Sequence, residues 1–143
     1  MEKLSASLED YLEIIYNKIE SNEAVRAVDI ARELNVSRAS VTEALNKLSA
    51  KGLINYGRYQ TITITDMGIN VAKEVAGRHS SLSSFFSDVL GADSCEAEKN
   101  ACRIEHIISA ELIERIELFG EFTRKNPHLS EEFEQFYKEC VKK

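Results

Sequence analysis

The sequence contains few of the residues that interrupt helices or cross-link a chain. Its 143 residues include one proline and six glycines, so long helices should dominate the fold. Cysteine is also scarce, because Cys95, Cys102 and Cys140 form a sparse and odd-numbered set. Such a set is more typical of a reducing cytosol than of a disulfide framework.

Long apolar runs are absent as well. No uncharged apolar stretch approaches the ~18 residues that a membrane-spanning helix needs. The N-terminal segment MEKLSASLEDYLEII carries acidic side chains where a signal peptide has its apolar run. We therefore expect a cytoplasmic protein that has neither a membrane partner nor an export signal.

Charge is unevenly distributed along the chain. Hydrophobic residues make up 43% and charged residues 29% of the sequence, which is enough for a packed core, and the formal net charge is −6. Residues 24–64 nevertheless hold six cationic and three acidic side chains, a local charge of +3 that leaves −9 for the rest. A basic segment on an acidic chain is a weak but recognisable indication of a surface that contacts phosphate groups.

Three helices are predicted at the start of the chain. Ser7, with Asp10 three residues later, resembles an N-terminal cap of the first helix. Ser37 is the expected cap of the third helix, which ends near Gly52. Apolar positions at helical spacing then predict helices over residues 7–20, 27–34 and 37–52.

A pair of strands is predicted directly after these helices. Residues 61–65 alternate between threonine and isoleucine, and residues 53–56 provide a partner strand, with 57–60 as the hairpin tip. The second and third helices are separated by a short turn at 35–37. Two helices across a tight turn, followed by a strand pair, predict the winged form of the helix-turn-helix motif.

The second half of the chain lacks a strand pattern. Gly91 and Pro127 interrupt a sequence that otherwise has the spacing of amphipathic helices. The fold class is therefore mainly α, an N-terminal winged helix-turn-helix domain over 1–70 followed by an all-helical domain over 71–143. The apolar positions of 67–124 exceed what one small monomer can bury, which predicts a homodimer. Helices are expected over residues 67–90, 95–109, 110–124 and 129–141.

The start of the third helix is a candidate DNA-binding surface. Its first residues are small or polar, and its later polar residues face away from the apolar positions Val41, Leu45 and Leu48. Such a helix can enter the major groove, although a winged helix can also serve protein contacts. The candidate DNA contacts, including two at the hairpin tip, are Arg26, Ser37, Arg38, Ala39, Ser40, Thr42, Glu43, Asn46, Lys47, Arg58 and Tyr59.

A second group of residues has the chemistry of a metal site. Glu98, Cys102, Glu105 and His106 fall on one stripe if their segment is a continuous helix. Carboxylate, thiolate and imidazole groups together suit a divalent transition metal. The alternative is a solvated helix face that carries one buried cysteine. Further candidates, which taken alone fit an acidic surface and a core histidine, are Asp10, Glu13 and His79.

Four segments together resemble a known protein family. They are the opening helix SLEDYLEIIY, Val36-Ser37-x2-Ser40-Val41-Thr42, Arg78-His79 and Cys102-x2-Glu105-His106. In order, and over nearly the whole chain, they are similar to the diphtheria-toxin-repressor and manganese-transport-regulator family. The resemblance implies a homodimeric, metal-activated repressor in the short form that lacks an SH3-like domain. It also implies the metal ligands Asp10, Glu13, His79, Cys102, Glu105 and His106, with Glu98 as an auxiliary candidate.

The ligand set mixes the two branches of that family. The iron branch usually has methionine where this chain has Asp10, and the manganese branch usually has a carboxylate at Cys102. The iron branch's auxiliary site has a glutamate at Ser83 and a histidine at Glu98, so that site should be altered or absent. The soft thiolate makes Fe(II) our first expectation and Mn(II) a close second.

The sequence therefore predicts a repressor that controls iron or manganese homeostasis. Its expected partners are double-stranded operator DNA and a second copy of itself, with no small-molecule substrate. One alternative is a winged-helix regulator that responds to oxidation of Cys102 and not to metal. A metal-dependent hydrolase is the weakest alternative, because the sequence offers no separate acid, base or nucleophile, and we expect no enzyme activity.

Overall fold

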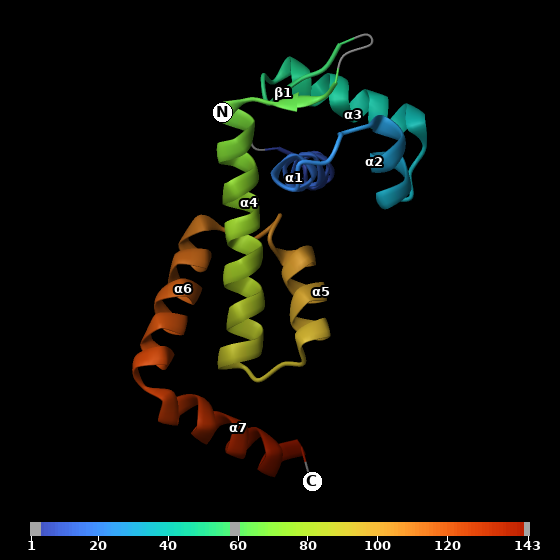
Figure 1. Ribbon diagram of the computed structural model, residues 1–143. Coiled ribbons are helices and arrows are strands. Elements are labelled where there is room, and N and C mark those ends of the chain that lie inside the picture. Colours follow the sequence, from blue (N-terminus) through green and yellow to red (C-terminus); the bar gives the residue numbers. More distant parts are fainter. Residues whose placement is uncertain (1–3, 58–60, 142–143) are drawn as a thin grey trace. The chain divides into compact units, whose positions relative to one another are not determined.

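The computed structural model describes residues 4–57 and 61–141, and the chain divides into two compact units, Met1–Ala76 and Gly77–Lys143 (Figure 1). The division falls within α4. The same helix contains residue 70, where the sequence predicts the boundary between the two domains. We describe each unit by itself. The elements of the first unit are α1 (Ala6–Glu20), α2 (Ala27–Glu33), α3 (Arg38–Ala50), β1 (Ile54–Asn55), β2 (Thr63–Ile64) and the first part of α4 (Asp66–Ser84).

The first unit is held together by one apolar core. Leu12 from α1, Ile30 from α2 and Leu45 from α3 are all fully buried in it. Leu53 and Ala72 extend the same core to the hairpin and the start of α4. Because each helix buries one apolar stripe against the others, the opposite face of α3 is left on the surface.

The turn between α2 and α3 has the short, tight form that the sequence predicts. Asn35 adopts a φ of 53°, a left-handed conformation that asparagine tolerates better than most residues. Beside it, the Val36 amide donates a 3.0 Å hydrogen bond to the carbonyl of Ala31, which closes the end of α2. Ser37 then caps α3, as expected, by accepting a hydrogen bond from the Ser40 amide.

The strand pair is antiparallel and shorter than predicted. Ile54 pairs with Ile64 and Asn55 with Thr63, so each strand has only two residues. Thr65 fastens the pair to the rest of the unit: its hydroxyl donates to the Gly52 carbonyl and accepts from the Gly68 amide at the start of α4. The predicted tip residues Arg58 and Tyr59 lie outside the described residues.

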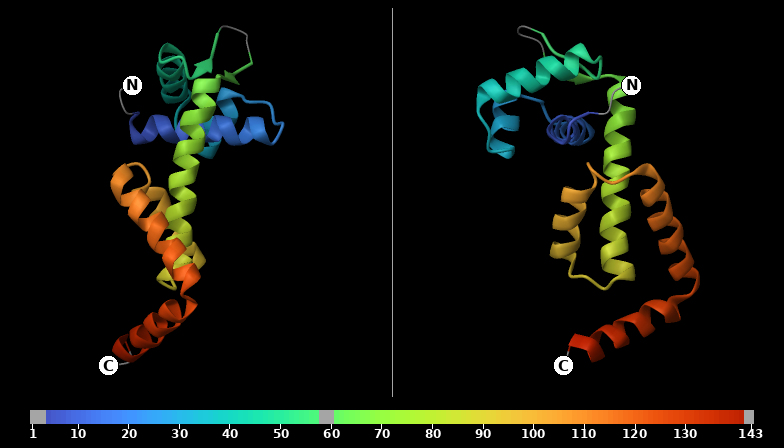
Figure 2. Two further views of the ribbon diagram at one scale, coloured as in Figure 1. Left: turned by 90° about the vertical axis from the view of Figure 1, so that its left-hand side faces the viewer. Right: turned by 180° about the vertical axis from the view of Figure 1, so that it is seen from behind.

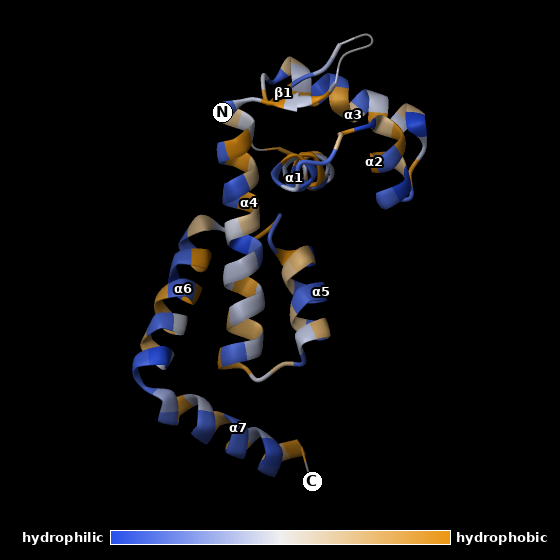
Figure 3. Cartoon of the chain, viewed as in Figure 1, coloured by the Kyte–Doolittle hydropathy of each residue, from blue (hydrophilic) through white to orange (hydrophobic). Residues whose placement is uncertain are grey.

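The second unit is entirely helical where it is described. The last turns of α4 lie between α5 and α6 (Figures 1 and 2), where Leu82 packs with Ala101 and Ile113. Apolar positions recur along α6 and α7 (Figure 3), and many of them are exposed. The elements are the end of α4, a π-helical turn η1 (Phe85–Val89), α5 (Ser94–Ile104), α6 (Ala110–Lys125) and α7 (Pro127–Val141).

The mainly helical fold class and the helix-turn-helix are confirmed, but several predicted boundaries are wrong. Ser5, not Ser7, caps α1, because the helix begins one residue earlier than predicted. The helix expected over 95–109 ends at Ile104, and Ser109 caps the next helix. The last helix begins at Pro127, where a proline costs nothing because the first turn of a helix needs no amide donor. Gly91 does end its segment, with a φ of 67°.

Among the described residues, no helix has both the length and the apolar character required to cross a lipid bilayer.

Candidate nucleic-acid interface and metal centre

The N-terminal half of α3 presents a polar surface, as the sequence predicts. Val41, Ala44, Leu45 and Leu48 are buried on one face of the helix. The opposite face is built from the predicted contacts, and its first residues include the small side chains of Ala39 and Ser40. The exposed predicted contacts on and before α3 are Ser37, Arg38, Ala39, Ser40, Thr42, Glu43, Asn46 and Lys47.

Hydrogen bonds between neighbouring side chains order this surface. The Lys47 ammonium group donates to the Glu43 carboxylate over 2.7 Å, and this bond lowers the pKa of Glu43 below its usual value. The Thr42 hydroxyl donates to the Arg38 carbonyl over 3.0 Å. Glu43 is therefore charge-compensated within the helix, so an acidic residue at this position does not by itself oppose contact with DNA.

A groove borders the same surface between α2, α3 and the hairpin. Arg26, Thr42 and Asn46, three of the predicted contacts, line it. Tyr56 and Thr61 also line the groove. The sequence did not identify either residue as a candidate DNA contact. Their place depends on how the hairpin folds against α3, a tertiary feature that no local pattern encodes.

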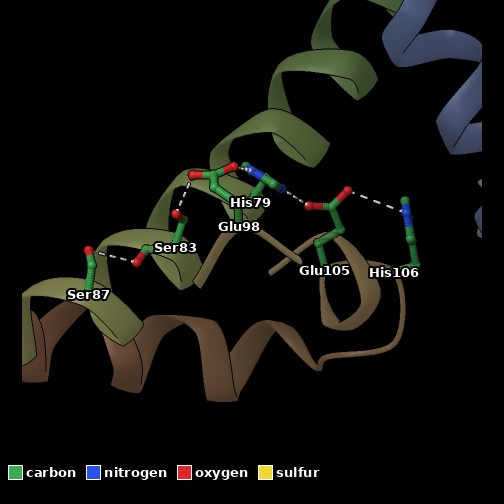
Figure 4. A network of polar contacts seen from close by, with 6 residues as sticks. All are labelled: His79, Ser83, Ser87, Glu98, Glu105 and His106. Carbon is green, nitrogen blue, oxygen red and sulfur yellow. Dashed lines mark hydrogen bonds and ion pairs between the residues drawn. The ribbon is translucent and has the colours of Figure 1, made fainter. Parts of the chain in front are cut away.

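In the second unit, His79 of α4 is the centre of a network of polar contacts (Figure 4). Its Nδ1 lies 2.6 Å from Oε2 of Glu105, and its Nε2 lies 2.7 Å from Oε2 of Glu98. The network continues to His106, whose Nε2 lies 3.3 Å from Oε1 of Glu105, and to Ser83, whose hydroxyl donates to Glu98. Four of the predicted metal-site residues therefore meet in one connected group.

The charges of this network shift the protonation of its members. Partial burial of His79 lowers the pKa of its imidazole, but the hydrogen bonds and charges of Glu98 and Glu105 outweigh that effect and raise the net pKa. The hydrogen bond from Ser83, followed by the one from His79, lowers the pKa of Glu98. The two carboxylates thus stabilise the cationic form of the imidazole.

Glu105 is buried at the C-terminal end of α5, one helical turn after the buried Ala101. Its residue is 0% exposed, and its amide donates to the Ala101 carbonyl over 2.9 Å at the helix end. Glu98 and Cys102 lie within α5 and are exposed. Because α5 ends at Ile104, the expectation of one continuous helix that carries Glu98 through His106 is wrong. Cys102 is also not the buried cysteine that the alternative interpretation required. Cys95 lies on the same helix, too far along it to pair with Cys102.

The remaining predicted ligands lie in the first unit. Asp10 and Glu13 are half-buried residues of α1, one helical turn apart on its surface. Within residues 4–57 and 61–141, no three histidine, cysteine, aspartate or glutamate side chains already converge as a metal-binding group. The donor chemistry nevertheless fits a divalent metal, since imidazole and carboxylate groups are in direct contact around His79.

A winged helix-turn-helix with an exposed recognition helix, together with a partly buried imidazole–carboxylate network, defines a class of DNA-binding, metal-responsive proteins. The family comparisons agree. Residues 3–62 match the model described as the N-terminal DNA-binding domain of iron-dependent repressors, and residues 65–134 match its metal-binding and dimerisation domain.

Individual relatives support the same assignment. An uncharacterised HTH-type transcriptional regulator of Methanocaldococcus jannaschii is 39% identical over 119 residues, which cover 82% of this chain and 95% of that protein. The HTH-type transcriptional regulator MntR of Listeria welshimeri is 36% identical over 121 residues, 85% of this chain and 84% of that protein. This chain belongs to the iron-dependent repressor family, the family of the diphtheria-toxin repressor and MntR, whose members are metal-dependent DNA-binding transcriptional repressors.

Solved structures show the same fold. A manganese-dependent transcriptional repressor in complex with manganese has a TM-score of 0.73 and 31% identity, over 80% of this chain and 53% of that one. The manganese regulator SloR has a TM-score of 0.69 and 28% identity, over 78% and 52%. The chain thus spans about half the length of these two proteins of known structure.

Family membership decides several of the predictions. The family is one of transcription regulators, which confirms that the chain is not an enzyme and removes the hydrolase alternative. Its two matched domains imply DNA and a second copy of the chain as partners, and binding of a divalent metal.

Proposed function

We propose that this protein represses genes of iron or manganese homeostasis when it binds a divalent metal ion. The observation that carries the proposal is the contact between His79 and Glu105, an imidazole and a fully buried carboxylate 2.6 Å apart. A buried carboxylate is costly unless it is paired or holds a cation. In a family whose second domain is described as metal-binding, this pair is the natural core of the ligand set.

The proposed ligands come from three helical segments. Asp10 and Glu13 lie on α1, and His79 lies on α4. Cys102 lies on α5, and Glu105 and His106 follow its end. When bound, the metal would be held by imidazole, carboxylate and thiolate donors of this set. If the metal binds the DNA-binding conformation more tightly than the alternative one, it shifts the conformational equilibrium toward DNA binding.

Fe(II) is the proposed physiological metal, with Mn(II) as the close second. Asp10 and Glu13 are hard oxygen donors that suit Mn(II), whereas the Cys102 thiolate is a softer donor that favours iron. Cys102 is exposed on α5, so its sulfur is accessible to a ligand. The relatives named as manganese regulators make Mn(II) the direct competitor.

The proposed DNA contacts are those of the polar face of α3, with Arg26 and the hairpin residues Arg58 and Tyr59. In a homodimer, two copies of α3 would read two successive major grooves of operator DNA. If metal strengthens DNA binding by some factor, DNA must strengthen metal binding by the same factor. We place this regulator in the cytoplasm, without a membrane partner or a small-molecule substrate.

One other mode of regulation has a specific observation in its favour. Because Cys102 is exposed, its thiol can be reached by an oxidant, and oxidation would remove the proposed ligand. A thiol-responsive regulator would bind DNA equally well with and without metal while reduced. The metal-dependent mode predicts instead that the reduced protein needs a metal.

The test is an operator titration under anaerobic, reducing conditions. A binding duplex is first selected from a random DNA library with metal-loaded protein, and the affinity of that duplex is then measured with Fe(II), Mn(II), Zn(II) or a chelator. We expect tight binding with Fe(II) or Mn(II) that the chelator reverses. Equal affinity in chelator would contradict metal dependence and favour the thiol mechanism.

A further inference from the structure

Glu98 was predicted from the sequence as an auxiliary metal ligand, but the geometry points to a different role. We propose that Glu98 is a positioning residue: it accepts a hydrogen bond from Nε2–H of His79 and so directs Nδ1 of that imidazole toward Glu105 and the metal. The inference rests on the proposed function, because it concerns how the chain prepares one ligand of that site.

The two carboxylates that contact His79 have different surroundings. Glu105, on the Nδ1 side, has a side chain only 1% exposed and also contacts His106, another proposed ligand. Glu98, on the Nε2 side, has a side chain 59% exposed, and its partners in the network are His79 and Ser83, which is not a proposed ligand (Figure 4). Nδ1 is therefore the ring nitrogen that faces the ligand set, and Nε2 faces away from it.

Both oxygens of Glu98 already have partners within the protein. Oε2 lies 2.7 Å from Nε2 of His79, and Oε1 accepts a 2.5 Å hydrogen bond from the Ser83 hydroxyl. Ser83 lies one helical turn after His79 on α4, so Glu98 reaches from α5 to two positions on one face of α4. Ser87 adds a further bond to this face, since its hydroxyl donates to the Ser83 carbonyl.

This arrangement has a known chemical use. A histidine that binds a metal through one ring nitrogen usually donates the other N–H to a carboxylate, which fixes the tautomer and the direction of the ring. Glu98 occupies that place, held in turn by Ser83. As a ligand, Glu98 would have to turn at least one of these oxygens toward the metal, whereas as a positioning residue it keeps both hydrogen bonds as they are.

Binding of Co(II), a spectroscopic substitute for Fe(II), separates these roles in the full chain. The variants are Glu98→Gln, whose amide oxygen still accepts from Nε2–H, and Glu98→Ala, which removes the acceptor. Glu96→Gln is the matched control, because Glu96 is an exposed carboxylate on the same helix. Stoichiometry, affinity and the visible Co(II) spectrum are measured for each variant, together with the melting temperature.

We expect the same stoichiometry and Co(II) spectrum in all variants. Affinity should fall about 10–100-fold in Glu98→Ala and be largely restored in Glu98→Gln. Equal losses in both variants, with a changed spectrum or stoichiometry, would show that Glu98 is a ligand and overturn the inference. An unchanged Co(II) affinity in Glu98→Ala with a lower melting temperature would also overturn the inference. Glu98 would then only stabilise the packing of α5 against α4.

A second measurement keeps the inference independent of affinity. In the Zn(II)-loaded protein, long-range ¹H–¹⁵N correlation should show the His79 ring protonated at Nε2 and metal-bound at Nδ1. Metal bound at Nε2 would contradict the inference. If the wild-type chain bound neither Co(II) nor Zn(II), the proposed function itself would fail, an outcome distinct from any pattern among the variants.

Discussion

The imidazole of His79 and the carboxylate of Glu105 are joined by a 2.6 Å contact between Nδ1 and Oε2. The two residues are far apart in the sequence and belong to different segments, α4 and the turn that follows α5. Glu105 is the C-cap of α5, with a helical backbone one turn after the buried Ala101, and its side chain lies inside the second unit.

Arg38 tests the DNA-binding surface. It is the first residue of α3 and is exposed, and the first turn of this helix contains no acidic residue. Arg38→Glu should abolish operator binding, because it replaces a cation with an anion beside the DNA phosphates. The fold should not suffer, since an acidic residue at a helix N-terminus is stabilising by about 0.3–1 kcal/mol.

Operator affinity and melting temperature are measured for this variant in parallel. Lys138→Glu is the control, because it makes the same charge change on α7, away from the proposed interface in the sequence. Affinity retained in Arg38→Glu, or lost equally in Lys138→Glu, would remove α3 from the interface.

Phe122 tests the homodimer predicted over residues 67–124. Its side chain is 51% exposed on α6, in a group of rings with Phe119 at a centroid distance of 6.0 Å. If the second copy covers this apolar surface, Phe122→Glu should weaken the dimer tenfold or more, a cost of about 1.4 kcal/mol. Phe136→Glu on α7, where the ring is 64% exposed but lies beyond residue 124, should leave the dimer intact. Sedimentation equilibrium with metal present compares the two, and equal dissociation would refute the proposed range.

Gly68 tests how the hairpin is joined to α4. A Cβ at this position would meet the Leu53 carbonyl oxygen and Cγ1 of Ile64, so the backbone of the hairpin would have to move. Gly68→Ala should therefore lower the free energy of unfolding by about 1–3 kcal/mol.

Gly77→Ala in the same helix is the control. Among the described residues, no atom outside the helix's own backbone lies within 4 Å of the added Cβ. Alanine should therefore stabilise the helix by about 0.5–1 kcal/mol. Thermal unfolding that ranked the two variants in the opposite order would contradict the packing.

Local patterns predicted most of the helices but not all of their ends. The buried stripe of α3 and the Ser37 cap follow from spacing and capping chemistry, and both are confirmed. The end of α5 was missed, because residues 105–109 have apolar spacing that continues the helix while Ser109 offers a cap for the next one. The apolar spacing favours a longer α5, whereas the Ser109 cap favours a new helix. Tertiary packing of Ile108 and Ile113 decides between the two.

The candidate site was predictable as a set of residues but not as a geometry. The resemblance identified His79, Glu98 and Glu105 as candidates, and the structure brings them together. The resemblance did not identify Ser83 as the residue that donates a hydrogen bond to Glu98. That role depends on the packing of α5 against α4, which a hydrophobic pattern predicts only in outline.

The identity of the metal depends on Cys102. A thiolate at this position favours Fe(II), whereas a carboxylate would make the ligand set harder and favour Mn(II). Cys102→Glu should therefore shift activation of operator binding toward Mn(II). Cys102→Ser should weaken the Fe(II) response tenfold or more, about 1.4 kcal/mol, because a neutral hydroxyl is a poor substitute for a thiolate.

Cys95→Ser is the matched control, because Cys95 is an exposed cysteine on the same helix, and it should leave the Fe(II) response unchanged. Anaerobic titration of operator binding with each metal gives the midpoints. If both Cys102 variants kept the metal ranking and midpoint of the parent protein, Cys102 would not be a ligand and the preference for iron over manganese would lose its chemical basis.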